Sequence, residues 1–175
     1  EEIGDATWLG CGCPLWAPVG LVDGLRIGRD VGVEWRGSED VHSAESLLRD
    51  QATRNFANGI LWQADPDCIL LRDRFHHLSE SELRSLAIYA GMAAGVVMTS
   101  DALDELSAER VRLFKLLLSP ERALCRFPLL GSGDPVSVQV RQRVGDEPAS
   151  LAAIFVFNTG DAPAQRSYSL ARLGL

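Results

Sequence analysis

Short apolar runs alternate with stretches of helical periodicity over roughly the first two thirds of this 175-residue chain. The apolar runs cover residues 6–11, 22–27, 60–62 with a continuation at 69–71, and 96–98. Each run leads into glycine, proline, serine or aspartate, which is typical of a strand that ends in a loop. Because strands and helices take turns along the chain, we predict parallel βα units here.

Three segments between the apolar runs carry helix signals. In residues 43–56, apolar side chains recur at helical spacing and a glycine stop follows. Ser79 and Glu82 form the capping-box pattern, in which a serine and a glutamate three residues later satisfy free amides at the start of a helix. A third helix is expected to begin at Ser107 and to end at Pro120.

The pattern changes after about residue 124. Residues 137–143 and 166–173 alternate between polar and apolar positions, and residues 151–157 form an apolar run. Turn-forming residues separate these segments, so we predict an antiparallel sheet in this part of the chain.

These elements predict the fold class α/β, with the second half of a (β/α)8 TIM barrel at residues 1–123 and an antiparallel β-sheet domain at residues 124–175. Four βα units are half of the eight that close a barrel of about 250 residues. The last three residues, Leu-Gly-Leu, bring no helix stop or polar tail, so the β domain is expected to be incomplete. We therefore interpret the chain as a fragment that lacks the N-terminal half of its barrel.

The charge balance argues against a nucleic-acid partner. Lys and Arg number 17 and Asp and Glu number 24, so the formal net charge is −7 and the isoelectric point is near 4.9. Such a chain has no general attraction for phosphate backbones. The longest uncharged stretch, residues 85–100, is shorter than the roughly 20 apolar residues that span a bilayer, so no membrane partner is expected.

Cysteine residues are not spaced as metal ligands. The four cysteines are Cys11, Cys13, Cys68 and Cys125, and one residue separates the first two. Thiolate sites usually need two ligand pairs at wider spacing, so we expect no metal and no cofactor. Four reduced thiols, and acidic residues where a secretory signal would begin, favour a cytoplasmic location.

Side chains with useful chemistry gather where the predicted strands end, which in a barrel is the catalytic face. These strand ends cover residues 11–16, 26–30, 62–68 and 99–101. Carboxylates, an arginine and tryptophans on one rim suit a sugar, because aromatic rings cover its apolar face and charged groups bind its hydroxyls. One of the acids could also protonate a glycosidic oxygen.

The same strand ends carry an ordered set of motifs. They read Leu-Gly-Cys-Gly-Cys-Pro-Leu at 9–15, Gly-Leu-Val-Asp-Gly-Leu-Arg-Ile-Gly-Arg-Asp at 20–30, Trp-Gln-Ala-Asp-Pro-Asp-Cys-Ile-Leu-Leu-Arg at 62–72, and Thr-Ser-Asp at 99–101. In this order, over most of residues 6–120, the chain resembles the α-galactosidase-like glycoside hydrolases, the melibiase clan of families 27 and 36. The resemblance implies a carbohydrate substrate and a retaining α-glycosidase of carbohydrate metabolism that hydrolyses terminal α-linked sugars.

The resemblance also implies roles for particular residues. Asp30, four residues after Arg26, takes the position of the acid/base catalyst at the sixth barrel strand. Asp67, and less closely Asp65, lies in the segment of the seventh strand that contacts sugar hydroxyls. Arg26 and Asp67 are therefore candidate substrate-binding residues, and Asp30 is the candidate catalytic residue.

The loop after the first strand faces the 2-position of the sugar by the same likeness, which adds Cys11 and Trp16 to the substrate-binding candidates. Gly12 and Cys13 stand where some members carry larger polar residues, so the identity of the sugar stays open. The nucleophilic aspartate of the clan follows a lysine and one further residue, whereas Lys115 is the only lysine here. The nucleophile is therefore expected upstream, and the isolated fragment is expected to be inactive and to form homo-oligomers or require its missing half.

Simpler interpretations exist for several of these residues. Residues 26–30 can hold a structural ion pair, although the four ordered motifs favour a catalytic role. Residues 65–67 match an ordinary turn, and Asp101 is expected to cap a helix. Trp8 and Trp35 are expected in the core or the barrel wall. The alternative to an enzyme is a non-catalytic carbohydrate-binding or assembly fragment that kept the rim of the site.

Overall fold

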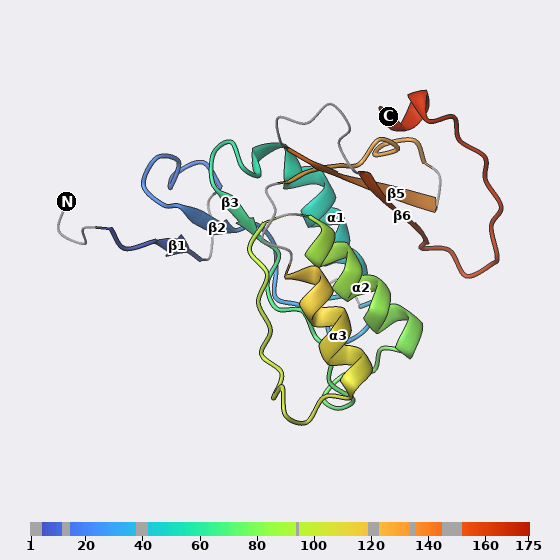
Figure 1. Cartoon of the computed structure of the whole chain (residues 1–175), viewed down its shortest axis with the longest axis horizontal. Coiled ribbons are helices and arrows are strands. Elements are labelled where there is room, and N and C mark those ends of the chain that lie inside the picture. The colour runs from blue at the N-terminus through green and yellow to red at the C-terminus, as the bar shows by residue number, and fades with distance from the viewer. Residues whose placement is uncertain are drawn as a thin grey trace.

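The computed structural model describes residues 5–11, 15–37, 42–93, 95–118, 123–133, 136–144 and 152–175 of the chain. Within these residues, three α-helices lie between a parallel and an antiparallel sheet, each of three strands (Figure 1). The parallel sheet lies on the side of the N-terminus, and the antiparallel sheet lies on the side of the C-terminus. This succession of a parallel α/β part and an antiparallel part agrees with the sequence-based prediction.

The parallel sheet consists of β1 (Leu9–Gly10), β2 (Gly24–Arg26) and β3 (Gln63–Asp65), in that order. In the register of β2 and β3, Arg26 pairs with Asp65. The loops that follow these two strands therefore begin at the same level, on the carboxyl edge of the sheet.

The apolar run at residues 96–98 does not form the predicted fourth strand. The Val96 N–H donates to the Ala64 carbonyl at 2.8 Å, and Thr99 makes a single parallel bridge with Ile69. The run thus lies beside β3 without a continuous ladder. The parallel sheet of the described residues is open and three-stranded, which corrects the prediction of a fourth strand at residues 96–98.

The helices are α1 (Ala44–Arg54), α2 (Glu80–Met92) and α3 (Ala108–Leu117). Each begins after a serine whose side chain accepts a hydrogen bond from the amide three residues later, as at Ser79, so one of the free N–H groups of each first turn is satisfied. The capping box predicted for Ser79 and Glu82 is confirmed. In the described part of the chain, no helix is both long and apolar enough to span a membrane.

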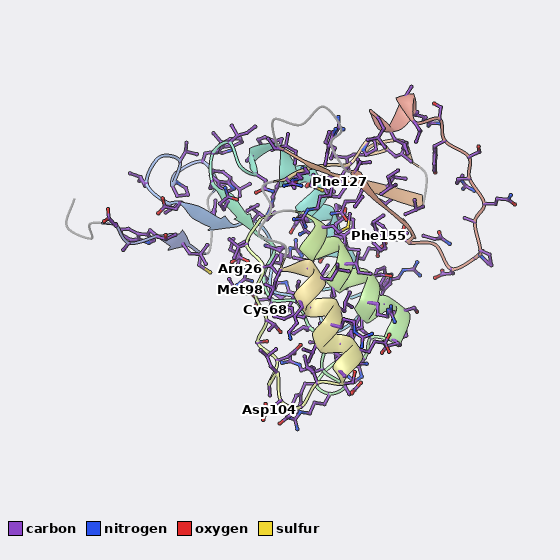
Figure 2. All side chains as sticks on the ribbon, viewed as in Figure 1. Arg26, Cys68, Met98, Asp104, Phe127 and Phe155 are labelled. Carbon is purple, nitrogen blue, oxygen red and sulfur yellow. The ribbon has the colours of Figure 1, made fainter. Side chains whose placement is uncertain are left out.

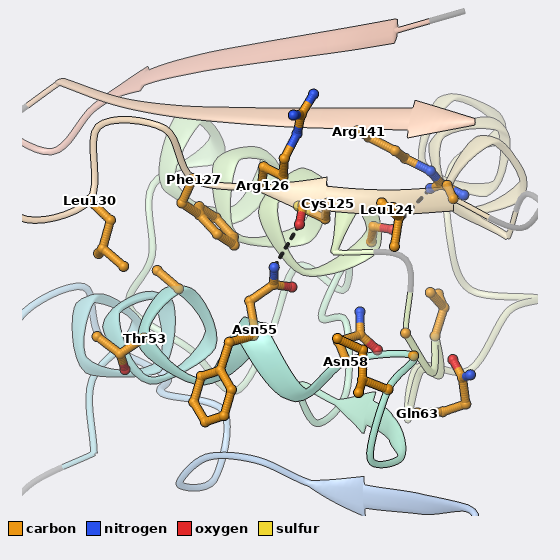
Figure 3. A pocket seen from close by; sticks show the side chains of 18 of the residues that line it. Thr53, Asn55, Asn58, Gln63, Leu124, Cys125, Arg126, Phe127, Leu130 and Arg141 are labelled. Atoms are coloured by element: carbon orange, nitrogen blue, oxygen red, sulfur yellow. Dashed lines mark hydrogen bonds between the residues drawn. The ribbon is translucent and has the colours of Figure 1, made fainter. Parts of the chain in front are cut away.

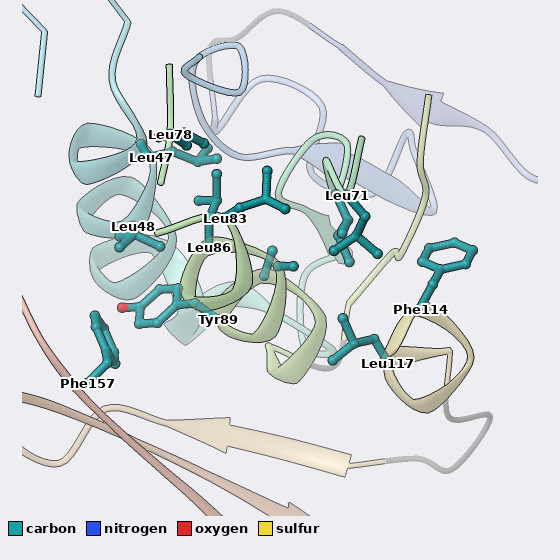
Figure 4. Close-up of a cluster of buried hydrophobic side chains, with 14 of the residues drawn as sticks. Leu47, Leu48, Leu71, Leu78, Leu83, Leu86, Tyr89, Phe114, Leu117 and Phe157 are labelled. Atoms are coloured by element: carbon teal, nitrogen blue, oxygen red, sulfur yellow. The ribbon is translucent and has the colours of Figure 1, made fainter. Parts of the chain in front are cut away.

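The main hydrophobic core lies between α1 and α2 and includes part of the antiparallel sheet (Figure 4). Leu47 and Leu48 of α1 and Leu86 of α2 are buried in it. The ring of Tyr89 in α2 meets Phe157 edge to face, with their centroids 4.7 Å apart. Because fully burying one such side chain stabilises a fold by about 1.5–3 kcal/mol, these contacts hold the helices against the sheet.

The antiparallel sheet consists of β4 (Ala123–Arg126), β5 (Val136–Arg143) and β6 (Ala152–Asn158), in that order. It confirms the strands predicted from the alternation at 137–143 and from the apolar run at 151–157, of which residue 151 lies outside the described residues. Val138 and Val140 of β5 are fully buried on one face of the strand, and Gln139 between them is fully buried on the other, so both faces of β5 are covered. The domain boundary at residue 123 stays a prediction.

Residues 166–173 do not form the strand that their alternation predicts. Their last residues form the 3₁₀ turn η2 (Ala171–Leu173), which ends at Gly174 with φ of 75°. Leu173 is buried in the cluster with Val138, whereas Leu170 is exposed. A strand needs a neighbouring strand with which to pair. This segment instead packs the Leu173 side chain against the antiparallel sheet.

Candidate active site

Three strand ends bring the sequence-predicted side chains together on the carboxyl edge of the parallel sheet. Cys11 follows β1, Arg26 ends β2, and Asp65 ends β3. Figure 2 labels Arg26 and Cys68 on this side of the molecule. The carboxyl ends of parallel strands are where α/β folds place their ligands, so this edge is the candidate active site.

The Arg26 guanidinium is the centre of this site. Its Nη2 donates a hydrogen bond to Asp30 and lies 3.4 Å from Asp67 Oδ2, and its Nη1 lies 3.9 Å from Cys11 Sγ. The hydrogen bond with Asp30 is the largest cause of the raised pKa of Arg26. Arg26 Nε is buried and has no hydrogen-bond partner among the described residues. Four of the five site residues predicted from the sequence, Arg26, Asp30, Asp67 and Cys11, therefore meet at one guanidinium.

Asp30 is the exposed member of the group, with 69% of its side chain accessible to solvent. The hydrogen bond and the charge of Arg26 lower the pKa of the Asp30 carboxyl. Asp30 is therefore an ionised carboxylate in this arrangement, open to solvent and to a ligand on its free side.

Asp67 is held in place by backbone amides. Its Oδ2 accepts a hydrogen bond from the Val31 N–H at 2.7 Å, and its Oδ1 accepts one from the Cys68 N–H at 2.7 Å. Its backbone has a φ of 75°, a left-handed conformation that aspartate tolerates better than most residues. Asp67 is thus fixed against Arg26 by the turn that contains it.

Asp65 supports that turn and faces away from solvent. Its Oδ1 accepts a hydrogen bond from the Asp67 N–H at 2.9 Å, which is the local turn expected of Asp-Pro-Asp. Burial is the largest cause of the raised pKa of Asp65. Asp65 therefore fits the interpretation as an ordinary turn residue, whereas Asp67 projects toward Arg26.

Two of the four tryptophans, Trp8 and Trp62, are placed differently from the predictions. Trp16 is 63% exposed and packs on Phe56, with ring centroids 6.0 Å apart. Its ring therefore contacts the 3₁₀ turn Asn55–Ala57 that follows α1. Trp8 is 55% exposed, which corrects its predicted burial. Its backbone N–H donates to the Asp23 carboxylate, and its carbonyl accepts from the amides of residues 23 and 24, so these bonds hold the backbone and leave the ring in solvent. Trp35 packs against the main core as predicted, and Trp62 is buried and does not lie on the rim. Gly12 and Cys13 lie outside the described residues.

Asp101 does not cap a helix, which corrects its prediction. Its side chain is completely buried, and its Oδ2 accepts a hydrogen bond from the Leu71 N–H at 2.6 Å. The cap of α3 is Ser107, as the sequence predicts. Sequence reasoning also assigned no role to Ser100, whose side chain counteracts the rise in the pKa of the Cys68 thiol. The available signal was its place in the Thr-Ser-Asp strand end.

A groove of about 840 Å³ lies elsewhere (Figure 3). It is lined by Asn55 after α1, Gln63 at the start of β3, and Leu124 and Arg141 of the antiparallel sheet. Asn55 crosses it to donate to the Cys125 carbonyl at 2.7 Å. This groove borders the amino end of β3, where structural contacts are expected, so its size does not make it the catalytic site.

Among the described residues, no group of three or more histidine, cysteine or carboxylate side chains is arranged to hold a metal ion. The chemistry available at Arg26 is that of one cation, two carboxylates and a thiol. Such a set can bind hydroxyl groups and exchange a proton through an exposed carboxylate.

No protein-family model matches the chain. Two solved structures of an α-galactosidase from Thermus thermophilus share its fold at 32% sequence identity. The complex with p-nitrophenyl α-D-galactopyranoside aligns with a TM-score of 0.59 over 70% of this chain and 27% of that chain. The complex with stachyose aligns with a TM-score of 0.53 over 67% of this chain and 27% of that chain. The chain thus has an α-galactosidase-like fold that spans about a quarter of that enzyme, and it is related to glycoside hydrolases.

Proposed function

We propose that the chain is the C-terminal part of the catalytic barrel, with the start of the β domain, of a retaining α-glycosidase that resembles α-galactosidases. The observation that carries the proposal is the meeting of Asp30, Asp67 and Cys11 at the Arg26 guanidinium, on the carboxyl ends of adjacent parallel strands. The similarity to the Thermus enzyme supports a terminal α-linked galactose as the substrate sugar.

Asp30 is the acid/base catalyst in this proposal. Its carboxyl faces solvent, so a glycosidic oxygen can reach it. Because Arg26 lowers its pKa, Asp30 must gain a proton before it can act as the acid. A retaining glycosidase has a second carboxylate roughly 5–5.5 Å from the acid/base, and repulsion between the two negative charges raises the pKa of the acid/base.

Asp67 and Arg26 bind sugar hydroxyls without transferring protons. Each carboxylate oxygen of Asp67 accepts one backbone N–H and can accept one further hydrogen bond, from a sugar hydroxyl. The two backbone bonds also fix the carboxylate, so it is not free to attack a sugar carbon. The Cys11 thiol lies beside the same Arg26 guanidinium and therefore borders the same binding space. The nucleophile comes from polypeptide that precedes this chain, because Lys115 lies in α3 and no Lys-x-Asp motif is present in the sequence.

The test is hydrolysis of p-nitrophenyl α-D-galactopyranoside and of stachyose by the full-length protein. A general acid contributes about 10²–10⁴-fold, mainly for poor leaving groups, so Asp30→Asn should impair stachyose hydrolysis far more than aryl galactoside hydrolysis. Asp161→Asn is the matched control, since it also removes an exposed, arginine-paired carboxylate, 3.0 Å from Arg36. Equal losses on both substrates would remove Asp30 from the acid/base role.

One observation favours a second candidate function, carbohydrate binding without catalysis. The Arg26 contact that holds Asp30 ionised would suit a binding residue better than an acid. In that case the full-length protein would bind galactose and stachyose but would hydrolyse neither. The turnover measurement therefore separates the two functions.

A further inference from the structure

A cavity of about 680 Å³ lies between α1 and the antiparallel sheet. Its volume is within the range of about 300–1,000 Å³ that is typical of small-molecule sites. The core side chains of Leu48 in α1, Tyr89 in α2 and Phe157 in β6 line it and lie near one another in Figure 4. Ser46 of α1 and Ser137 of β5 line it as well, so apolar and hydroxyl side chains border the same space.

Two arginines that line this cavity have free guanidinium groups. Among the described residues, the guanidinium groups of Arg29, Arg49 and Arg112 make no hydrogen bond, ion pair or ring contact, whereas those of the other arginines do. Arg29 and Arg49 both line the cavity, and Arg112 lies in α3. In a chain of net charge −7, where most arginines find a partner, two free guanidinium groups in one cavity favour an anionic ligand.

Arg29 lies beside the part of α1 that carries Arg49. Gly28, the residue before Arg29, packs so closely on the helix that a Cβ at this position would lie 3.2 Å from Leu47 Cδ1 and 3.4 Å from Asp50 Cβ. Leu47 and Asp50 belong to the same helical turn as Arg49. The two free arginines therefore reach the cavity from neighbouring segments of the backbone.

Carboxylates near the cavity are already paired with other arginines. Glu45, the one carboxylate among the described lining residues, lies 3.8 Å from Arg36 Nε. Asp50, which follows Arg49, lies 3.8 Å from Arg54 Nη2. The described lining therefore carries an excess of positive charge.

A phosphate group matches two guanidinium groups better than a carboxylate does. Near pH 7 a phosphate monoester carries a charge of about −1.5 to −2 and three strong acceptor oxygens. The planar guanidinium binds such oxygens through parallel N–H donors. The volume of the cavity leaves room for an organic group beyond the phosphate, which the hydroxyl and apolar side chains can contact.

We propose that this cavity binds a small, hydroxylated phosphate ester, such as a hexose phosphate, with its phosphate at Arg29 and Arg49. None of the side chains that meet at the Arg26 guanidinium is among the described residues that line the cavity, so the site is separate from the candidate active site. The inference goes beyond the proposed function, and binding tests it without any measurement of turnover.

The experiment measures binding to the full-length protein by calorimetry, with glucose 6-phosphate, inorganic phosphate and glucose as probes. Glucose 6-phosphate should bind more tightly than inorganic phosphate and far more tightly than glucose. Arg29→Ala and Arg49→Ala should each weaken its binding roughly tenfold or more, because each removes a hydrogen bond between charged groups. Arg49→Lys keeps the charge without the planar donors, so it should lose less than Arg49→Ala. Arg112→Ala removes a free guanidinium outside the cavity and is the matched control.

The three arginines are exposed and hold no other side chain, so the alanine variants should fold like the wild type. If glucose 6-phosphate does not bind, or if it binds equally well to both cavity variants and the wild type, the site is overturned. An equal loss in Arg112→Ala would also overturn it, because the overall charge of the protein would then explain the binding. Equal affinities for inorganic phosphate and glucose 6-phosphate would assign the cavity to free phosphate and overturn the ester.

Discussion

Arg26 is the residue on which the candidate site depends, because one guanidinium reaches Cys11, Asp30 and Asp67. A lysine would carry the same charge at one point and could not reach both carboxylates and the thiol at once. A planar cation can thus hold together the loops that follow three adjacent strands.

We predict that the pair of Asp30 and Arg26 stabilises the fold except at acidic pH. The folded-state pKa of Asp30 is lowered, so its contribution is present above the unfolded pKa and is lost as the pH falls through the folded pKa. Because Asp30 is largely exposed, the contribution should be about 0.2–1 kcal/mol. Denaturant unfolding of the wild type and Asp30→Asn at neutral pH and below about pH 3 measures it.

The Arg26→Ala background is the control for this measurement. Without the guanidinium, Asp30→Asn should change the free energy of unfolding by less, at every pH. A difference between wild type and Asp30→Asn that stays constant down to the lowest pH would contradict the assignment of the lowered pKa to Arg26.

The cysteines should differ in reactivity toward iodoacetamide. Burial raises the pKa of the Cys125 thiol to about 11, so at pH 8 roughly one in a thousand of these groups is a thiolate. Burial likewise raises the pKa of Cys68, whereas Cys11 is exposed. Peptide mass mapping after brief labelling should find Cys11 modified and Cys125 unmodified, and denaturant should remove the difference. Equal labelling of both in the native protein would show that the β4 strand opens readily.

Single residues show where sequence reasoning succeeds and where it stops. Arg26, Asp30 and Asp67 could be predicted as neighbours, because each lies at or just after the end of a strand and parallel strand ends meet at one edge. The exposure of Trp8 and the burial of Asp101 could not be predicted. Each depends on which distant segment covers the side chain, as Leu71 does for Asp101.

At the scale of elements, the C-terminal end of α2 is held by side chains from outside the helix. Gln139 of β5 donates to the Tyr89 carbonyl at 2.9 Å, and Arg141 of β5 donates to the Gly91 carbonyl at 3.3 Å. Asn58 donates to the Ala93 carbonyl at 2.7 Å. The last turn of α2 has no basic residue of its own, so the sheet and the preceding loop satisfy its free carbonyls.

Replacing Gln139 with leucine should therefore destabilise the protein by about 1–3 kcal/mol, because the Tyr89 carbonyl would stay buried without a donor. Thermal or denaturant unfolding measures this loss. Gln63→Leu is the control, since it makes the same substitution at an exposed position at the start of β3. Equal stability of the two variants would show that the Gln139 bond contributes nothing net.

Helix starts were predictable from sequence because their signals are local. The capping box of Ser79 needs only residues within one turn of the helix. Strands at 96–98 and 166–173 were predicted wrongly because a strand also requires a partner at the right distance, which the alternation of side chains does not reveal.

At the scale of the whole molecule, β1 lies on the edge of the parallel sheet and, among the residues that the structure describes, pairs with β2 alone. Trp8, Leu9 and Leu21 near this edge are exposed. An uncovered strand edge with apolar side chains promotes pairing with another chain. The sequence could predict the α/β order, but it could not predict how far the sheet closes. Closure into a barrel depends on more strands than the three of the described parallel sheet.

The last prediction is that residues 1–175 alone associate with themselves and do not hydrolyse glycosides. Retention needs a nucleophile roughly 5–5.5 Å from the acid/base, and the nearby Asp67 is held by two backbone amides. The open edge at β1 should meanwhile give species heavier than the 19.0 kDa monomer in sedimentation. Adding the polypeptide that precedes this chain in the full-length protein should restore both turnover and a defined size. Hydrolysis of p-nitrophenyl α-D-galactopyranoside by a monodisperse monomer of residues 1–175 would refute both the missing nucleophile and the uncovered edge.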